Sequence, residues 1–193
     1  MPNTSNSMVN QVIFLISPKT HFLDLAGPDQ VFFEATDFGA PLTLEYCRYA
    51  DTAYSSSGIY FEKLKHFSKI KLNKGDYVFI PGVDIKLLLS KETTGRKDLF
   101  NWLRKAYENG VILCSVCTGA FLLAASGLLD GRNATTHWKR VKELKEHYPK
   151  INVLENVLFT TDDRIYTSAG IVAGIDLALF VLEKMMGEFF AHK

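Results

Sequence analysis

Short apolar runs alternate along the chain with stretches whose apolar residues recur at helical spacing. Four runs are typical of fully buried strands, at residues 12–17, 42–50, 76–82 and 111–116. Between the last two runs, residues 98–107 place apolar side chains on one side of a predicted helix, beside a charged face. The sequence therefore predicts that strands and helices alternate.

This alternation predicts an α/β fold with a mainly parallel sheet covered by helices, because parallel neighbouring strands need a crossover connection that is usually a helix. In such sheets, ligands bind at the carboxyl ends of the strands. Residues 54–72 have a different pattern. The SSSG stretch at residues 55–58, followed by alternating Ile59 and Phe61, predicts a hairpin-rich excursion from the sheet.

Polar residues dominate the N-terminal end of the chain. Residues 1–11 are expected to form a flexible tail, and residues 12–193 a single domain, because 193 residues can bury one sizeable core. The final segment, residues 170–190, has helical spacing and is followed by neither Gly nor Pro. Two interpretations are open there: the natural chain continues beyond Lys193, or it ends in a helical turn that frays.

Charge and composition exclude several classes of protein. The chain has 22 Lys and Arg residues against 21 Asp and Glu, so it lacks the basic footprint of a nucleic-acid-binding module and is expected to make no direct nucleic-acid contact. With 47% hydrophobic and 22% charged residues, it is expected to be globular. No apolar run approaches the roughly 20 residues that cross a bilayer, and no signal-peptide pattern is present. Three cysteines do not make a disulfide framework, which favours a reducing, cytoplasmic location.

The most informative position is Cys117. The buried-strand pattern of residues 111–116 ends directly before it, and a small-residue helix, TGAFLLAASG, is predicted directly after it. Cys117 is therefore predicted at a strand-to-helix elbow at the top of the sheet. The free N–H groups of the helix would favour the thiolate, which can act as a nucleophile. The alternative is an unreactive core residue, because cysteine is one of the most buried residue types.

Cys114 and Cys117 also form a C-x-x-C pattern, which occurs in redox and metal sites. Three residues of extended chain separate their Cα atoms by about 10 Å, which is beyond disulfide reach. A metal would need further ligands, yet the five histidines show no ligand spacing and there is no second cysteine pair. The sequence therefore predicts neither a redox pair nor a metal site, and it indicates no cofactor.

Three blocks of the sequence are distinctive: FLDLAGPDQVF at 22–32, CSVCTGAFLLAASGLLDGRNATTHW at 114–138 and TSAGIVAGIDLAL at 167–179. Together they resemble the ThiJ/PfpI superfamily, which has the class I glutamine amidotransferase-like fold. This resemblance implies a flavodoxin-like three-layer α/β/α sandwich with a nucleophile elbow, and a homodimer. Two branches match best: isonitrile hydratase, a stand-alone enzyme, and the sensor-like N-terminal domain of AraC-type transcriptional regulators.

The resemblance to isonitrile hydratase implies roles for three residues. Cys117 matches the cysteine that attacks the isonitrile carbon, Asp24 matches the carboxylate that handles protons, and Thr118 supplies the hydroxyl that follows the cysteine. A carboxylate beside a thiolate is protonated or hydrogen-bonded to it, and can then carry a proton to and from carbon or water. The alternative role for Asp24 is the N-cap of a helix that follows Pro28.

The expected oxyanion donors are the backbone N–H of Thr118 and one N–H from the loop at Gly82 and Val83. The family commonly has two adjacent glycines in that loop, and Val83 replaces the second one here. A β-branched residue resists a positive φ and narrows the pocket, so the replacement counts against catalytic competence.

Three other positions help to separate the branches of the superfamily. The protease branch carries a histidine directly after the cysteine, so Thr118 counts against peptidase activity. His137 resembles a site-proximal histidine that often lies near the dimer interface, and the alternative is a histidine satisfied by its neighbours at a helix start. Ser168 is expected to intrude on the site from the neighbouring loop, because isonitrile hydratases typically have a glycine-rich segment there.

Two functions from different classes remain. The first is the ligand-sensing and dimerisation domain of an AraC-type regulator, with an unidentified small molecule in the pocket of Asp24 and Cys117. Its DNA-binding helix-turn-helix region would lie outside these residues. The near-neutral charge and the TSAG block at residues 167–170 favour this function. The second is a stand-alone hydratase that converts isonitriles to N-substituted formamides, which would explain why Cys117, Asp24 and Thr118 occur together.

Overall fold

The computed structural model describes residues 10–191 and contains one large sheet. Its seven strands lie in the order β10-β11-β7-β6-β1-β3-β5. Their bounds are β1 Asn10–Ile16, β3 Leu42–Arg48, β5 Lys65–His66, β6 Tyr77–Ile80, β7 Ile112–Val116, β10 Phe159–Asp162 and β11 Ile165–Ser168. All neighbours are parallel except β10, which pairs antiparallel with β11. The predicted α/β fold with a mainly parallel sheet is confirmed.

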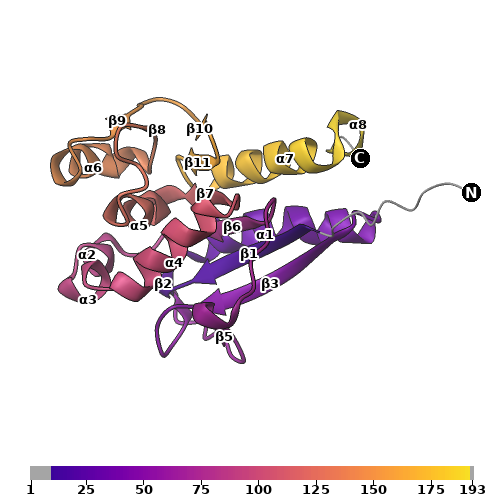
Figure 1. Cartoon of the computed structure of the whole chain (residues 1–193), viewed down its shortest axis with the longest axis horizontal. Helices are drawn as coiled ribbons and strands as arrows, with labels where there is room; N and C mark the ends of the chain where they lie inside the picture. Colours follow the sequence, from indigo (N-terminus) through magenta and orange to yellow (C-terminus); the bar gives the residue numbers. More distant parts are fainter. Residues whose placement is uncertain (1–9, 192–193) are drawn as a thin grey trace, which may run out of the picture.

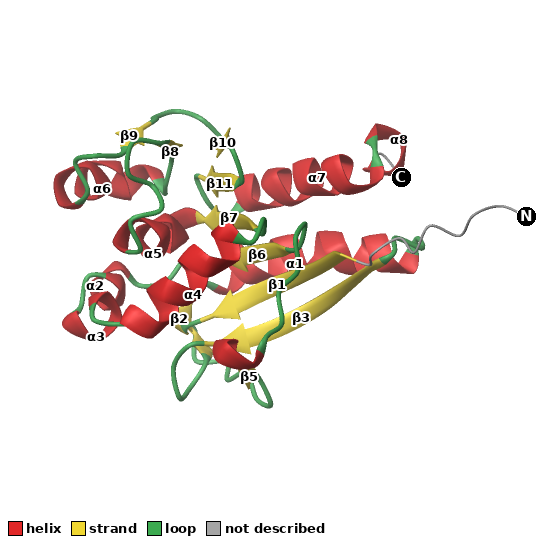
Figure 2. Cartoon of the chain, in the orientation of Figure 1, coloured by secondary structure: helices red, strands yellow, loops and turns green. Residues whose placement is uncertain are grey.

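Helices cover both faces of the sheet, which gives three layers (Figures 1 and 2). The longer helices are α1 Phe22–Asp37, α4 Lys97–Glu108, α5 Ala120–Ala125, α6 Val141–His147 and α7 Val172–Met186. Shorter elements are β2 Pro18–Thr20, β4 Tyr54–Ser55, η1 Phe67–Lys69, α2 Ile85–Leu88, α3 Lys91–Thr94, η2 Cys117–Gly119, β8 Asn133–Ala134, η3 Trp138–Arg140, β9 Asn152–Val153 and α8 Glu188–Ala191. No helix in the described part of the chain is long and apolar enough to cross a membrane.

The side chains of β1 alternate between two hydrophobic cores, one on each face of the sheet. Val12, Phe14 and Ile16 pack in the core that holds α1 and α7, whereas Ile13 and Leu15 pack in the core that holds α4 and α5. All five side chains are at most 1% exposed. A strand buried on both faces reads as a continuous apolar run, which is why the sequence pattern identified it.

The four predicted strands are confirmed as β1, β3, β6 and β7, and the predicted amphipathic helix as α4. The N-terminal boundary differs from the prediction. Asn10 and Gln11 belong to β1 and pair with β3, although the polar N-terminal sequence predicts a flexible tail for both. The N–H of Gln11 donates to the Asp76 carboxylate at 2.9 Å, a contact between distant segments that local polarity does not indicate. Residues 1–9 of the predicted tail lie outside the described residues.

Two other segments depart in part from the predicted pattern. Residues 54–72 contain an antiparallel bridge between Tyr54 and Tyr60, but β5 joins the edge of the main sheet parallel to β3. The helix predicted for residues 170–190 is divided in two at Gly187. This glycine has φ +86° and its N–H donates to the carbonyl of Glu183, so α7 ends there and the short α8 follows.

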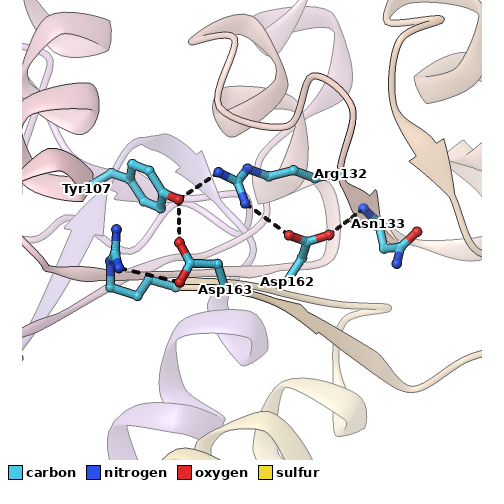
Figure 3. A network of polar contacts seen from close by, with 6 residues as sticks. Tyr107, Arg132, Asn133, Asp162 and Asp163 are labelled. Carbon is cyan, nitrogen blue, oxygen red and sulfur yellow. Dashed lines mark hydrogen bonds and ion pairs between the residues drawn. The ribbon is translucent and has the colours of Figure 1, made fainter.

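A polar network anchors the hairpin of β10 and β11 to the rest of the protein (Figure 3). The Arg132 guanidinium donates to the Tyr107 hydroxyl at 2.6 Å and to the Asp162 carboxylate at 2.9 Å. The Tyr107 hydroxyl donates to Asp163 at 2.5 Å, and the N–H of Asn133 donates to Asp162 at 3.0 Å. The network holds the start of β11, and the other end of β11 leads into the candidate site.

Candidate active site

Cys117 lies at the predicted strand-to-helix elbow. It follows Val116, the last residue of β7, and begins η2, which leads into α5. Its φ of +59° is uncommon for a residue with a side chain and costs of order 1–3 kcal/mol. The Thr136 hydroxyl donates to the Cys117 carbonyl at 2.9 Å and helps to hold this conformation. The elbow aims the thiol toward the carboxyl ends of the strands.

Asp24 reaches the thiol from the first turn of α1 and is 1% exposed. Its Oδ1 accepts a hydrogen bond from the N–H of Ile171 at 2.8 Å. Its Oδ2 has no hydrogen-bond partner among the described residues, and its nearest charged neighbour is Nδ1 of His21 at 3.3 Å. The alternative N-cap role is wrong, because α1 begins at Phe22 and Pro28 lies inside it.

His21 is the third member of this cluster, and the sequence analysis missed it. Its Nδ1 lies 4.0 Å from Cys117 Sγ, and its backbone N–H donates to the Gly82 carbonyl at 2.8 Å. One donor atom each from His21, Asp24 and Cys117 lies within 4.8 Å of the others, and these residue types bind metal ions. Histidine spacing gave no sign of this cluster, because the cysteine is almost a hundred positions away in the chain.

The ionisation of Cys117 is opposite to the sequence prediction. Burial raises the pKa of the Cys117 thiol well above its ordinary value, and the negative charge of Asp24 raises it further. The N–H of Thr118 acts in the other direction but more weakly. Because the residue is 2% exposed and lies beside a carboxylate, the thiol keeps its proton at neutral pH. The predicted thiolate is therefore not favoured.

The loop after β6 is hydrogen-bonded to the elbow at Thr118, so the backbone N–H of Val83 is not free to act as an oxyanion donor. The N–H of Val83 donates to the Thr118 hydroxyl at 2.8 Å, and that hydroxyl donates to the Val83 carbonyl at 2.6 Å. Val83 is not among the residues with positive φ, so the expected backbone conflict does not arise. A Cβ on Gly82 would lie 2.3 Å from Asp24 Oδ2, so glycine leaves room for the carboxylate.

A cavity of about 360 Å³ opens at the thiol. It is lined by His21, Phe22, Leu23, Asp24, Ser56, Cys117, Thr118, His137, Lys139, Arg140 and Ile171. Five of the seven residues that the sequence proposed for the site do line or adjoin it: Cys117, Asp24, Thr118, Gly82 and His137. The sequence gave no signal for Ser56, Lys139, Arg140 or Ile171, because the topology brings their segments together.

The two remaining positions lie differently from expectation. Ser168 does not intrude on the cavity: it is fully buried in β11, and its hydroxyl donates to the Ser115 carbonyl at 3.4 Å. Val83 is also absent from the cavity lining. His137 lines the cavity and accepts a hydrogen bond from the Lys139 N–H at the start of η3, so it is both close to the site and satisfied by a neighbour. Its place near a dimer interface stays a prediction. Partial burial lowers the pKa of His137.

Gly170 is a further site residue that the sequence analysis missed. It follows β11 with φ +94°, and a Cβ there would lie 2.4 Å from Cys117 Cβ and 2.9 Å from Cys117 Sγ. Only glycine combines this backbone conformation with this close approach. The loop from Gly170 to Ile171 therefore forms the wall of the site and supplies the N–H that orients Asp24.

Iodoacetamide is expected to alkylate Cys117 at least about tenfold faster than Cys47 or Cys114 in the native protein, because only Cys117 borders the cavity. Its pKa is raised, so the thiolate fraction is small at pH 7 and grows about tenfold for each unit of pH until the pKa is reached. Mass spectrometry of the labelled peptides measures the rates. Equal labelling of the three cysteines, or a rate that is flat above pH 7, would contradict this expectation.

The fold and the site together define an α/β protein with a cysteine at a strand-to-helix elbow. Residues 10–184 match the DJ-1/PfpI family, and the chain belongs to this family, which confirms the resemblance to ThiJ/PfpI proteins.

The chain is similar in sequence to relatives of two kinds, transcriptional regulators and an enzyme. The chain is 45% identical over 89 residues to the HTH-type transcriptional regulator CdhR of Pseudomonas aeruginosa, covering 46% of this chain and 26% of the regulator. It is 30% identical over 181 residues to the isonitrile hydratase of Pseudomonas putida, covering 93% of this chain and 74% of the enzyme. The crystal structure of an AraC family transcriptional regulator from Pseudomonas putida has the same fold, with a TM-score of 0.78 and 17% sequence identity. The superposition covers 95% of this chain and 96% of the regulator chain. The 89 aligned residues make up about a quarter of the length of CdhR.

Proposed function

We propose that this chain is the ligand-sensing and dimerisation domain of a cytoplasmic AraC-type regulator, and that the described residues, 10–191, act as one domain. The DNA-binding helix-turn-helix part would lie outside these residues. The sequence similarity to a regulator and the near-neutral charge support the proposal. The pocket around Asp24 and Cys117 would hold the small molecule.

The observation that carries the proposal is a cavity whose chemistry suits binding better than turnover. The Cys117 thiol keeps its proton because burial and Asp24 raise its pKa. The Val83 N–H, expected as an oxyanion donor, is engaged by the Thr118 hydroxyl. With the Cys117 thiol protonated and the Val83 N–H already hydrogen-bonded, the site is better suited to binding a small molecule than to catalysing its reaction.

The first test is to read the native coding frame past the codon for Lys193. We expect about another hundred residues with two basic helix-turn-helix patterns. In that longer protein, Asp24→Ala and Cys117→Ala should remove the ligand-dependent change in reporter transcription and leave DNA binding without ligand intact. A stop codon directly after Lys193 would contradict the regulator function.

The dimer would form through the face of the molecule that carries α1 and α7. This face exposes large apolar side chains, including Leu23 at 53%, Val172 at 65% and Leu179 at 40%. A second cavity of about 430 Å³ lies between these two helices and α8. Apolar patches of this kind are typical of protein interfaces, and a second copy of the chain is the proposed occupant.

The Leu179→Asp variant is expected to be monomeric where the wild type is dimeric, because an aspartate at the centre of an apolar interface loses its hydration. Size-exclusion chromatography with light scattering measures the mass of both. Lys105→Asp, on α4 at the opposite face of the sheet, is the matched control and should remain dimeric. A monomeric wild type, or a dimeric Leu179→Asp, would contradict the proposed interface.

A second candidate function, isonitrile hydration, is favoured by the proximity of Cys117 and Asp24 and by a relative that covers most of the chain. The Cys117 sulfur would bond to the isonitrile carbon while the thiol proton passes through Asp24 to that carbon. Water would then add to that carbon and the carbon–sulfur bond would break; one water proton goes to the nitrogen and the other returns to the Cys117 sulfur, which leaves an N-substituted formamide and the free thiol. Turnover of isonitriles by the purified chain, lost in Cys117→Ala, would support this function, and no turnover across several isonitriles would exclude it.

A further inference from the structure

The cluster of His21, Asp24 and Cys117 leaves one buried carboxylate oxygen without a hydrogen-bond donor among the described residues. Asp24 is 1% exposed, and its Oδ2 makes no well-formed hydrogen bond among the described residues; its polar neighbours are the His21 ring at 3.3 Å and the Cys117 thiol. A buried carboxylate oxygen that lacks a donor is costly unless a cation or a proton satisfies it. Its other oxygen is held by the N–H of Ile171 at 2.8 Å, so the carboxylate cannot turn away from the cluster without losing that bond.

We propose that His21, Asp24 and Cys117 bind one zinc ion through Nδ1, Oδ2 and Sγ, with the fourth coordination position open to the cavity. The proposal goes beyond the proposed function and does not depend on it. The three side chains come from the start of α1 and from the elbow after β7, so the fold itself brings the ligands together.

The distances between the donor atoms are close to those of a tetrahedral zinc site. Zinc binds nitrogen and oxygen at about 2.0–2.2 Å and sulfur at about 2.3 Å, which places N and O about 3.4 Å apart and N and S about 3.6 Å apart. The corresponding separations here are 3.3 Å between His21 Nδ1 and Asp24 Oδ2 and 4.0 Å between His21 Nδ1 and Cys117 Sγ. The third separation, between the Asp24 carboxylate and Cys117 Sγ, is at most 4.8 Å, so the sulfur must move toward the other two atoms for all three to bind one ion.

The charges and the donor types also suit zinc. Asp24 and Cys117 are two acidic groups in contact, and a divalent cation balances both when they are ionised. Binding forms the sulfur–zinc bond and releases the thiol proton to water, with no change of oxidation state. A mixed set of imidazole nitrogen, carboxylate oxygen and thiolate sulfur matches zinc, whereas magnesium and calcium prefer oxygen ligands alone.

Three protein ligands with an open fourth position are typical of zinc sites that bind water or an exchangeable ligand. The open position would face the cavity of about 360 Å³, whose lining also includes Lys139 and Arg140. A small anion could therefore coordinate the ion and contact these two cations.

Metal titration of the whole chain tests the proposal. The protein is stripped with a chelator, kept reduced with a phosphine, and titrated with Co²⁺ and then Zn²⁺. One Co²⁺ per chain should produce a thiolate-to-cobalt charge-transfer absorption, and Zn²⁺ should displace it. His21→Ala, Asp24→Asn and Cys117→Ala should each weaken Zn²⁺ binding by about 100-fold or more. His147→Ala, an exposed histidine on α6, is the matched control and should bind within about threefold of wild type.

A thermal readout keeps the test independent of how well each variant folds. Zn²⁺ should raise the melting temperature of the wild type and of His147→Ala, and should leave that of the three cluster variants unchanged. Mg²⁺ at the same concentration should have no effect on any of them. The proposal is overturned if no charge-transfer absorption forms, or if His21→Ala and Asp24→Asn bind Zn²⁺ as tightly as the wild type. These outcomes concern the metal alone and leave the test of the coding frame unaffected.

Discussion

The Gly170→Ala variant is expected to be about 3 kcal/mol less stable than the wild type. The left-handed backbone at φ +94° costs roughly 1 kcal/mol for a residue with a side chain. The new Cβ would lie 2.4 Å from Cys117 Cβ, and this overpacking costs roughly 2 kcal/mol more because the elbow must move. The melting temperature should fall by roughly 6–12 °C, as measured by thermal unfolding.

The matched control for this variant is Gly58→Ala. Gly58 has a similar φ of +90°, but no atom lies within 4 Å of the position of its Cβ. Only the backbone strain of roughly 1 kcal/mol should appear there. If the two variants lose the same stability, the contact between residue 170 and Cys117 does not constrain the site.

The Phe14→Ala variant is expected to lose about 4 kcal/mol, the largest loss in this set. Phe14 is fully buried in β1, and its ring lies 5.7 Å from that of Tyr46 and 5.6 Å from that of Phe79. Truncation removes the buried ring and leaves a cavity that the surrounding side chains fill only in part. Urea unfolding measures the loss, and the melting temperature should fall by roughly 8–16 °C.

Phe33→Ala is the control for the loss of an aromatic ring. Phe33 lies on α1 and is 48% exposed, so its removal should cost less than about 1 kcal/mol. A loss at Phe14 no greater than that at Phe33 would show that the core between the sheet and α1 is not packed as described.

Most of the fold could be predicted because its signals are local. The central strands are buried on both faces and read as apolar runs, and α4 reads as an amphipathic helix. The edge of the sheet was harder to predict. β5 has two residues, Lys65 and His66, and its place beside β3 depends on pairing that no local pattern encodes. Gly187 divides the last helix through a positive φ that helical spacing does not indicate.

The sequence by itself determined the alternation of strands and helices, the elbow at Cys117 and, through the family resemblance, the pairing of Cys117 with Asp24. Only the tertiary structure decided the state of these groups. The thiol keeps its proton because of burial and of Asp24, which is distant in the chain. His21 joins the pair because its own N–H is fixed to the loop after β6. The burial of a side chain and the charges around it depend on residues that only the fold brings together, so no local sequence pattern could predict these protonation states.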